Sequence, residues 1–119
     1  MDAIKFSAAL VAALLVAACG SAPEGGPRSV EQMYTTIGCA STYLQIDADE
    51  LRQGICETPQ GRYTITTFVT EKGKRDWLDY AQMWGGIYLV GELWAVVAKP
   101  DLLENLQDET GGELEDISA

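Results

Sequence analysis

The sequence contains no histidine. This absence excludes a Ser-His-Asp or Cys-His catalytic arrangement and a histidine general base. It also removes a common metal ligand, and the cysteines alone cannot complete a metal site. Neither of the glycine-rich loops that cradle phosphates, G-x-x-x-x-G-K-[ST] and G-x-G-x-x-G, occurs. The sequence therefore predicts no metal, no cofactor and no enzyme of these classes.

Basic residues are also scarce. The chain has 8 Lys and Arg against 18 Asp and Glu, and its formal net charge is −10. Nucleic-acid binding needs clustered cations that displace the counterions of phosphates, so no nucleic-acid partner is expected. The acidic stretch 101–116 is interpreted as a solvated surface. Calcium binding is the alternative, but "DETGGELEDIS" lacks the alternating acids around a central glycine of an EF-hand loop.

The longest apolar run, Phe6–Ala18, is only thirteen residues long. A helix that crosses the hydrocarbon core of a membrane needs about 20 such residues. The run has instead the length of the apolar region of a secretory signal, about 7–15 residues, and Lys5 precedes it. We therefore expect export followed by removal of this segment.

The run ends in Val16-Ala17-Ala18-Cys19. These four residues resemble the lipobox of bacterial lipoprotein precursors, an aliphatic residue and two small residues before a cysteine. The resemblance implies that the signal is cut between Ala18 and Cys19 and that Cys19 carries a diacylglycerol thioether. Further acylation of the new amino terminus, for example with palmitate, would make the anchor effectively permanent. The alternative is an ordinary signal peptide with a chance cysteine.

This interpretation divides the chain into three parts. Residues 1–18 are the cleaved signal peptide, and residues 19–29 are a lipid-anchored tether rich in glycine, proline and serine. Residues 30–119 are long enough for one small domain. The predicted location is the extracytoplasmic face of the cell membrane, and the predicted membrane contact is the covalent lipid on Cys19.

Three cysteines are an odd number for an exported protein. Lipidation of Cys19 leaves Cys39 and Cys56, and an oxidising compartment permits a disulfide between them. The sequence therefore predicts a Cys39–Cys56 disulfide, with two buried free thiols as the alternative.

The hydrophobic pattern predicts an N-terminal helix over 30–37, capped by Ser29 with Gln32 as capping-box partner and ended by Gly38. Strands follow at 41–46, 51–58 and 62–69, and then a helix over 71–84. A hairpin over 87–98 with its loop at Gly91 and Glu92, a helix after Pro100 and an edge strand over 113–117 complete the order.

These elements predict the α+β class: a small antiparallel sheet with the helices packed on one face, after an N-terminal helix and hairpin. From Arg62 the order is strand, helix, two strands, helix, strand, which matches the ferredoxin-like split βαβ arrangement. A plain layer of sheet and helices is the alternative.

Three aromatic residues of the 71–84 segment are candidates for a ligand surface: Trp77, Tyr80 and Trp84. Trp77 and Trp84 are spaced to share one face of the helix, with Tyr80 beside them. Packing of these rings against the sheet is the alternative. Asp76 and Asp79 in the same segment are spaced for a carboxylate pair, which we interpret as solvated.

The sequence thus predicts an anchored, extracytoplasmic lipoprotein that serves as a non-enzymatic binding or accessory module of the cell envelope, with an envelope protein or ligand as its partner. A carboxylate-dependent envelope hydrolase and a structural or inhibitory protein are the alternatives. Two facing carboxyl groups in a concave pocket would favour the hydrolase, whereas exposed hydrophobic edge strands would favour the structural or inhibitory protein.

Overall fold

The structure is a computed structural model that describes residues 26–117. The predicted signal peptide 1–18, the predicted cleavage site at Ala18, the predicted lipidation site Cys19 and most of the predicted tether 19–29 lie outside these residues. Within the described part of the chain, no helix has both the length and the apolar character needed to span a membrane.

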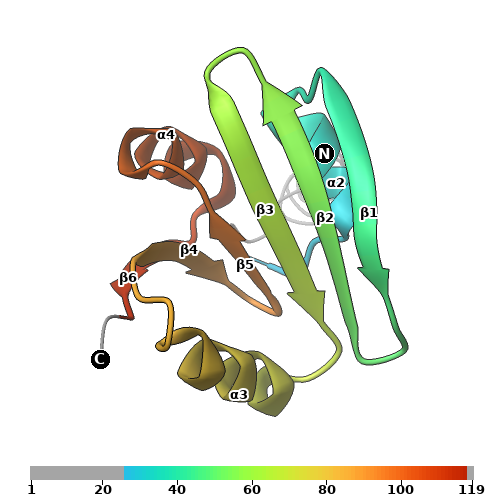
Figure 1. Ribbon diagram of the computed structural model, residues 1–119, viewed down its shortest axis with the longest axis vertical. Coiled ribbons are helices and arrows are strands. Elements are labelled where there is room, and N and C mark those ends of the chain that lie inside the picture. The colour runs from blue at the N-terminus through green and yellow to red at the C-terminus, as the bar shows by residue number, and fades with distance from the viewer. Residues whose placement is uncertain (1–25, 118–119) are drawn as a thin grey trace, which may run out of the picture.

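The centre of the fold is one six-stranded sheet (Figure 1), whose spatial order is β1-β2-β3-β5-β4-β6. Every neighbouring pair is antiparallel. Together with the three helices found in residues 26–117, this confirms the α+β class and the antiparallel sheet. The strands are β1 (Ser41–Asp47), β2 (Leu51–Thr58), β3 (Gly61–Phe68), β4 (Ile87–Gly91), β5 (Trp94–Val97) and β6 (Glu113–Asp116).

The helices in the described residues begin and end at local signals. Helix α2 (Val30–Ile37) starts with the expected capping box, because the Ser29 hydroxyl accepts from Gln32 N–H and the Gln32 side chain accepts from Ser29 N–H. Helix α3 (Glu71–Ala81) is capped by the Thr70 hydroxyl. Helix α4 (Pro100–Thr110) has Pro100 in its first turn and ends at Gly111, whose φ is 74°.

The helices do not share one face of the sheet, and this part of the prediction is wrong. Buried residues of α2 and α4 pack in one cluster with Ile65, Leu89 and Trp94, whereas Leu78 of α3 packs in a second cluster with Phe68. Adjacent residues of a strand point to opposite faces, so the two clusters lie on opposite sides of the sheet.

The handedness of the crossovers explains this division. The β3–α3–β4 and β5–α4–β6 crossovers step in the same direction across the sheet. Their first strands, β3 and β5, run antiparallel. Two right-handed crossovers that step the same way from oppositely directed strands place their helices on opposite faces.

The ferredoxin-like arrangement is not confirmed. Strand β5 does lie between β3 and β4, as a split βαβ unit requires. In the ferredoxin-like order, however, the last strand would lie beside the first strand of the unit, β3. Strand β2 already pairs with that side of β3, and β6 pairs with β4 instead.

Trp94 is the largest fully buried side chain in the described residues. Its indole N–H donates to the Gly26 carbonyl at 3.1 Å, which joins the start of the described chain to the core. A Cβ on Gly91 would lie 2.0 Å from the Trp94 ring, so this glycine makes room for the indole. The loop itself is Glu92 and Leu93, one residue later than expected, and Leu93 has a φ of 63°.

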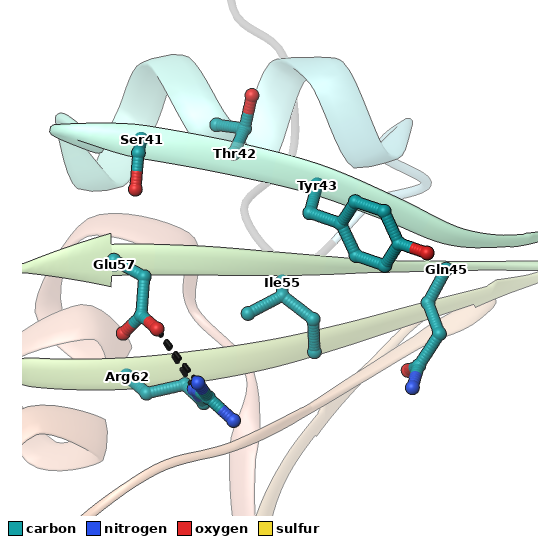
Figure 2. A pocket seen from close by; sticks show the side chains of 7 residues that line it. All are labelled: Ser41, Thr42, Tyr43, Gln45, Ile55, Glu57 and Arg62. Carbon is teal, nitrogen blue, oxygen red and sulfur yellow. Dashed lines mark hydrogen bonds and ion pairs between the residues drawn. The ribbon is translucent and has the colours of Figure 1, made fainter.

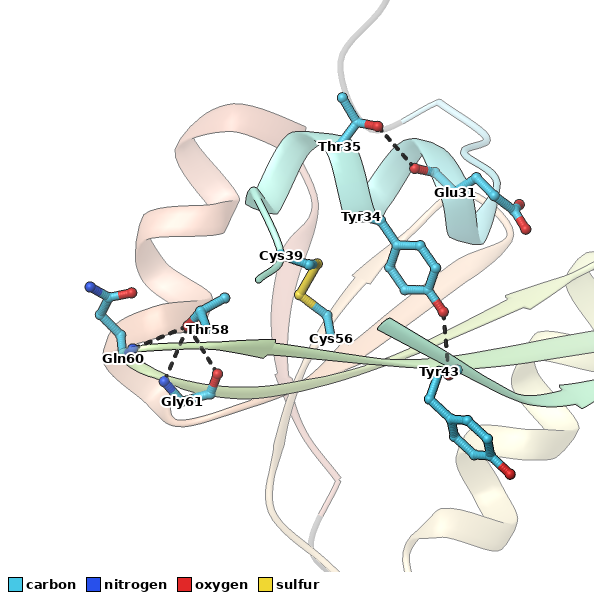
Figure 3. The surroundings of a disulfide bond; sticks show 9 residues. All are labelled: Glu31, Tyr34, Thr35, Cys39, Tyr43, Cys56, Thr58, Gln60 and Gly61. Carbon is cyan, nitrogen blue, oxygen red and sulfur yellow. Dashed lines mark hydrogen bonds between the residues drawn. A yellow bond between two sulfur atoms is a disulfide. The ribbon is translucent and has the colours of Figure 1, made fainter. Parts of the chain in front are cut away.

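The predicted disulfide between Cys39 and Cys56 is present (Figure 3). It joins the chain just after α2 to β2, and the Cys56 side chain is fully buried. Tyr34 of α2 lies over Gly54 of β2, where a Cβ would come within 2.0 Å of the Tyr34 hydroxyl. The helix is thus held against the sheet by one covalent bond and by close packing.

Candidate binding surfaces

Of the three candidate aromatic residues, Trp77 belongs to the packing of the domain. Its ring centroid lies 5.6 Å from that of Phe68 and 5.8 Å from that of Tyr88, in tilted and edge-on geometry. These contacts place it at the margin of the cluster between α3 and the sheet. Trp77 is partly buried, and its ring contacts agree with the packing alternative.

Tyr80 and Trp84 lie on the surface, with 62% and 73% of their side chains exposed. Tyr80 lies on the exposed side of α3, whereas Trp84 lies beyond the helix, because α3 ends at Ala81, three residues earlier than expected. A turn follows, in which the Trp84 N–H donates to the Ala81 carbonyl at 2.9 Å. Trp84 therefore does not continue the buried face of the helix, and the structure separates it from Trp77.

Two further apolar residues of this segment, which its sequence pattern did not mark as candidates, are also exposed. Met83 is 71% exposed and Ile87 is 38% exposed. Gly85 and Gly86, with φ values of 71° and 102°, lead the chain from the turn into β4. We call Tyr80, Met83, Trp84 and Ile87 the aromatic turn. The Gly85-Gly86 pair in the sequence indicated that the helix ends here, but it did not indicate that the neighbouring apolar side chains would be exposed.

A second surface lies on the sheet itself. Helix α3 packs against β3, β4 and β5 and its cluster reaches Leu51 at the start of β2, but no described helix covers the same face over β1 and the rest of β2 (Figure 1). Figure 2 shows the residues along this uncovered part, where Tyr43 and Ile55 stand on the uncovered side and Thr42 points to the other, and Figure 3 shows the Tyr43 ring on the side of the sheet away from Tyr34. We call this part the open face. It is a shallow hollow of about 410 Å³ lined by Ser41, Thr42, Tyr43, Gln45, Ile55, Glu57 and Arg62.

Two hollows on the described part of the chain each contain a single carboxylate, whereas a hydrolase of this kind needs two that face each other. The hollow of the open face contains one carboxylate, Glu57, and it is paired with Arg62 at 2.8 Å. A smaller hollow of about 180 Å³ between α2 and α4 also contains one, Glu109. Asp76, predicted to be solvated, is exposed and bound to Lys72 at 2.7 Å. Among residues 26–117, no group of three His, Cys, Asp or Glu could hold a metal ion.

The basic residues Lys74 and Arg75, near the start of α3, form a basic cluster that is paired with acidic residues. Lys74 is buried, and its ammonium contacts the Glu71 carboxylate at 2.9 Å and donates to the Gly91 carbonyl at 2.8 Å. Arg75 forms two parallel hydrogen bonds of 3.0 Å with the Glu115 carboxylate of β6. This pair ties α3 to the last strand, and the cluster is therefore part of the fold rather than a free cationic surface.

The Arg75–Glu115 pair predicts a pH-dependent contribution to stability. Hydrogen bonding to Arg75 holds the pKa of the Glu115 carboxyl below its ordinary value of 4.5. A lowered pKa in the folded state stabilises the fold above pH 4.5, and this contribution is lost as the pH falls through the lower value. We expect Glu115→Gln to reduce the free energy of unfolding at pH 7 and to leave it unchanged at pH 2.

Urea unfolding of the wild-type protein and the Glu115→Gln variant at several pH values measures this difference. Glu113→Gln, on the same strand but with an exposed side chain that forms no ion pair within the described residues, is the matched control. An equal loss of stability for Glu115→Gln at pH 2 and pH 7 would contradict the role of the ion pair.

No protein-family model matches this chain, and no curated protein or solved structure is significantly similar to it. The candidate surfaces therefore rest on the geometry described above.

Proposed function

We propose that this protein is a lipoprotein anchored through Cys19 on the extracytoplasmic face of the cell membrane. Its domain is a non-enzymatic binding or accessory module of the cell envelope, and the aromatic turn is its contact surface. The lipobox at Val16–Cys19 supports the anchor, and the absence of histidine supports a binding rather than a catalytic role.

The exposure of the aromatic turn is the observation that carries the proposal. Met83 and Trp84 are each more than 70% exposed, although the same small domain buries Trp94 completely. Burying one large apolar side chain contributes about 1.5–3 kcal/mol. A partner that covers the exposed side chains of this turn would therefore gain a substantial free energy of association. Tryptophan and tyrosine are also enriched among the residues that dominate binding energies.

A protein partner fits the charge of the molecule better than an anionic lipid surface does. The chain has a formal net charge of −10, and one of its acidic residues, Asp79, lies beside Tyr80 in the sequence. Anionic headgroups attract basic segments, whereas this chain would be repelled by them. An apolar pocket on a second envelope protein accommodates the turn without that repulsion.

Site-specific photocrosslinking in native membranes tests the proposal. With a photoreactive residue in place of Met83, we expect one dominant protein adduct. In a second variant that also has Trp84→Ala, we expect at least about a tenfold loss of this adduct, because the principal apolar contact is removed. The matched control places the photoreactive residue at Val69, which is 62% exposed on the loop before α3.

Equal adducts from positions 69 and 83, or lipid adducts alone from position 83, would contradict a protein-binding role for the aromatic turn. Mass spectrometry of the N-terminal peptide from the same membranes tests the anchor separately. We expect Cys19 to be the first residue and to carry the mass of a diacylglycerol. An unmodified internal Cys19 would contradict the anchor and leave the result for the turn intact.

A further inference from the structure

The two edges of the sheet are built differently. Strand β6, at one edge, is four residues long, and three of the four are acidic, Glu113, Glu115 and Asp116. Short length and charged side chains are the usual protection of an edge strand against pairing with another chain. Strand β1, at the other edge, is seven residues long and is uncharged from Ser41 to Ile46.

Strand β1 pairs with β2 on one side, and no other described strand lies on its outer side. All seven residues are exposed, including Tyr43 at 65%, Leu44 at 37% and Ile46 at 40%. The strand contains neither lysine nor proline. The register shift between Leu44 and Ile46 interrupts the ladder in the second half of the strand, and the run from Ser41 to Leu44 pairs regularly.

We propose that the outer edge of β1 binds an extended, basic segment of another protein, which adds a seventh strand to the sheet. Main-chain hydrogen bonds would supply affinity, and alternate side chains of the added strand would supply specificity. This surface is separate from the aromatic turn, so the inference does not depend on the function proposed for that turn.

The open face lies directly beside this edge. Tyr43 and Ile55 are register partners on β1 and β2, and both line the hollow of the open face. Side chains of an added strand that point to this face would lie next to Tyr43 and extend the row formed by Tyr43 and Ile55. Cross-strand pairs of aromatic and β-branched residues are favourable, so β-branched residues are expected at those positions of the segment.

Charge complementarity indicates that the segment is basic. The two arginines of β2 and β3 are already neutralised, Arg52 by Glu31 and Asp47 and Arg62 by Glu57. The turn between β1 and β2 carries two more carboxylates, Asp49 and Glu50, that form no ion pair within the described residues.

An incoming strand therefore meets uncompensated negative charge at the end of β1 near the β1–β2 turn. A second copy of this chain, with its net charge of −10, would be repelled.

Hydrogen–deuterium exchange of the full protein, purified from membranes in detergent, tests the proposal. The probe is the acetylated and amidated peptide KTVTVTK at millimolar concentration, and the matched control is ETVTVTE. We expect KTVTVTK to slow exchange of the outward-pointing amides of β1 by about tenfold or more, because the added strand accepts their hydrogen bonds and protects them from solvent. We expect no change in β6, and no protection of β1 by ETVTVTE.

Two variants separate edge pairing from general attraction between a basic peptide and an acidic protein. Tyr43→Lys introduces a charge on the unprotected edge, and Leu114→Lys makes the same change on β6, where the side chain is 38% exposed. Protection of β1 should be lost in the first variant and kept in the second.

Unprotected β1 amides in the presence of KTVTVTK would overturn the proposal, and so would equal protection by both peptides. Protection of β1 that grows with protein concentration, without peptide, would assign the edge to a second copy instead.

Discussion

Replacing Trp94 with alanine is expected to lower the free energy of unfolding by about 3–5 kcal/mol. The side chain is completely buried, and the described residues contain no larger fully buried one. Its removal leaves a cavity between the sheet and the α2 and α4 cluster. It also removes the donor for the Gly26 carbonyl, so the start of the domain loses an attachment to the core.

Trp84→Ala is the matched control, because it removes the same side chain from a position that is 73% exposed. Its effect on stability should be within about 0.5 kcal/mol. Urea unfolding followed by circular dichroism measures both variants without relying on tryptophan fluorescence. Similar midpoints for Trp94→Ala and Trp84→Ala would contradict the arrangement of the core described above.

Removing the disulfide is expected to have the second largest effect. The bond between Cys39 and Cys56 closes a loop with a sequence separation of 17, which on the chain-entropy model stabilises the fold by about 3 kcal/mol. For a domain of this size, this corresponds to a fall in the melting temperature of roughly 12–24 °C. The double variant Cys39→Ala/Cys56→Ala should show it in a thermal melt.

A reducing agent supplies the control for this experiment. It should lower the melting temperature of the wild-type protein to a similar extent and leave that of the double variant unchanged. Amide exchange should also rise first in α2, because the bond joins the chain after this helix to β2. An unchanged melting temperature after complete reduction, verified by a thiol assay, would contradict a stabilising role.

The aromatic turn shows how far the sequence could predict the candidate surface. Tyr80 and Trp84 were found from their residue type and spacing, but the spacing argument assumed a helix that continued to residue 84. Because α3 ends at Ala81, Trp77 packs against Phe68 while Trp84 is exposed. The exposure of Met83 depends on the same turn and could not be predicted from its apolar side chain.

The open edge at β1 could not be predicted either. Its residues indicated a strand correctly, and the hairpin with β2 was expected. Which strands form the edges depends on pairings between segments far apart in the sequence. Strand β3 pairs with β2 and β5, so β6 pairs with β4 and β1 remains unprotected.

The sequence by itself determined the features that depend on short-range interactions. The capping box at Ser29, the left-handed glycine after α2 and the type of each element follow from contacts within a few residues, and the order of these elements along the chain was enough to predict the α+β class. Only the tertiary structure decided that α3 lies on the opposite face from α2 and α4, that Trp94 is buried while Trp84 is exposed, and that one edge is unprotected. The physical reason is that strand order and the handedness of a crossover depend on how complete strand–helix–strand units pack together. No local sequence pattern contains this information.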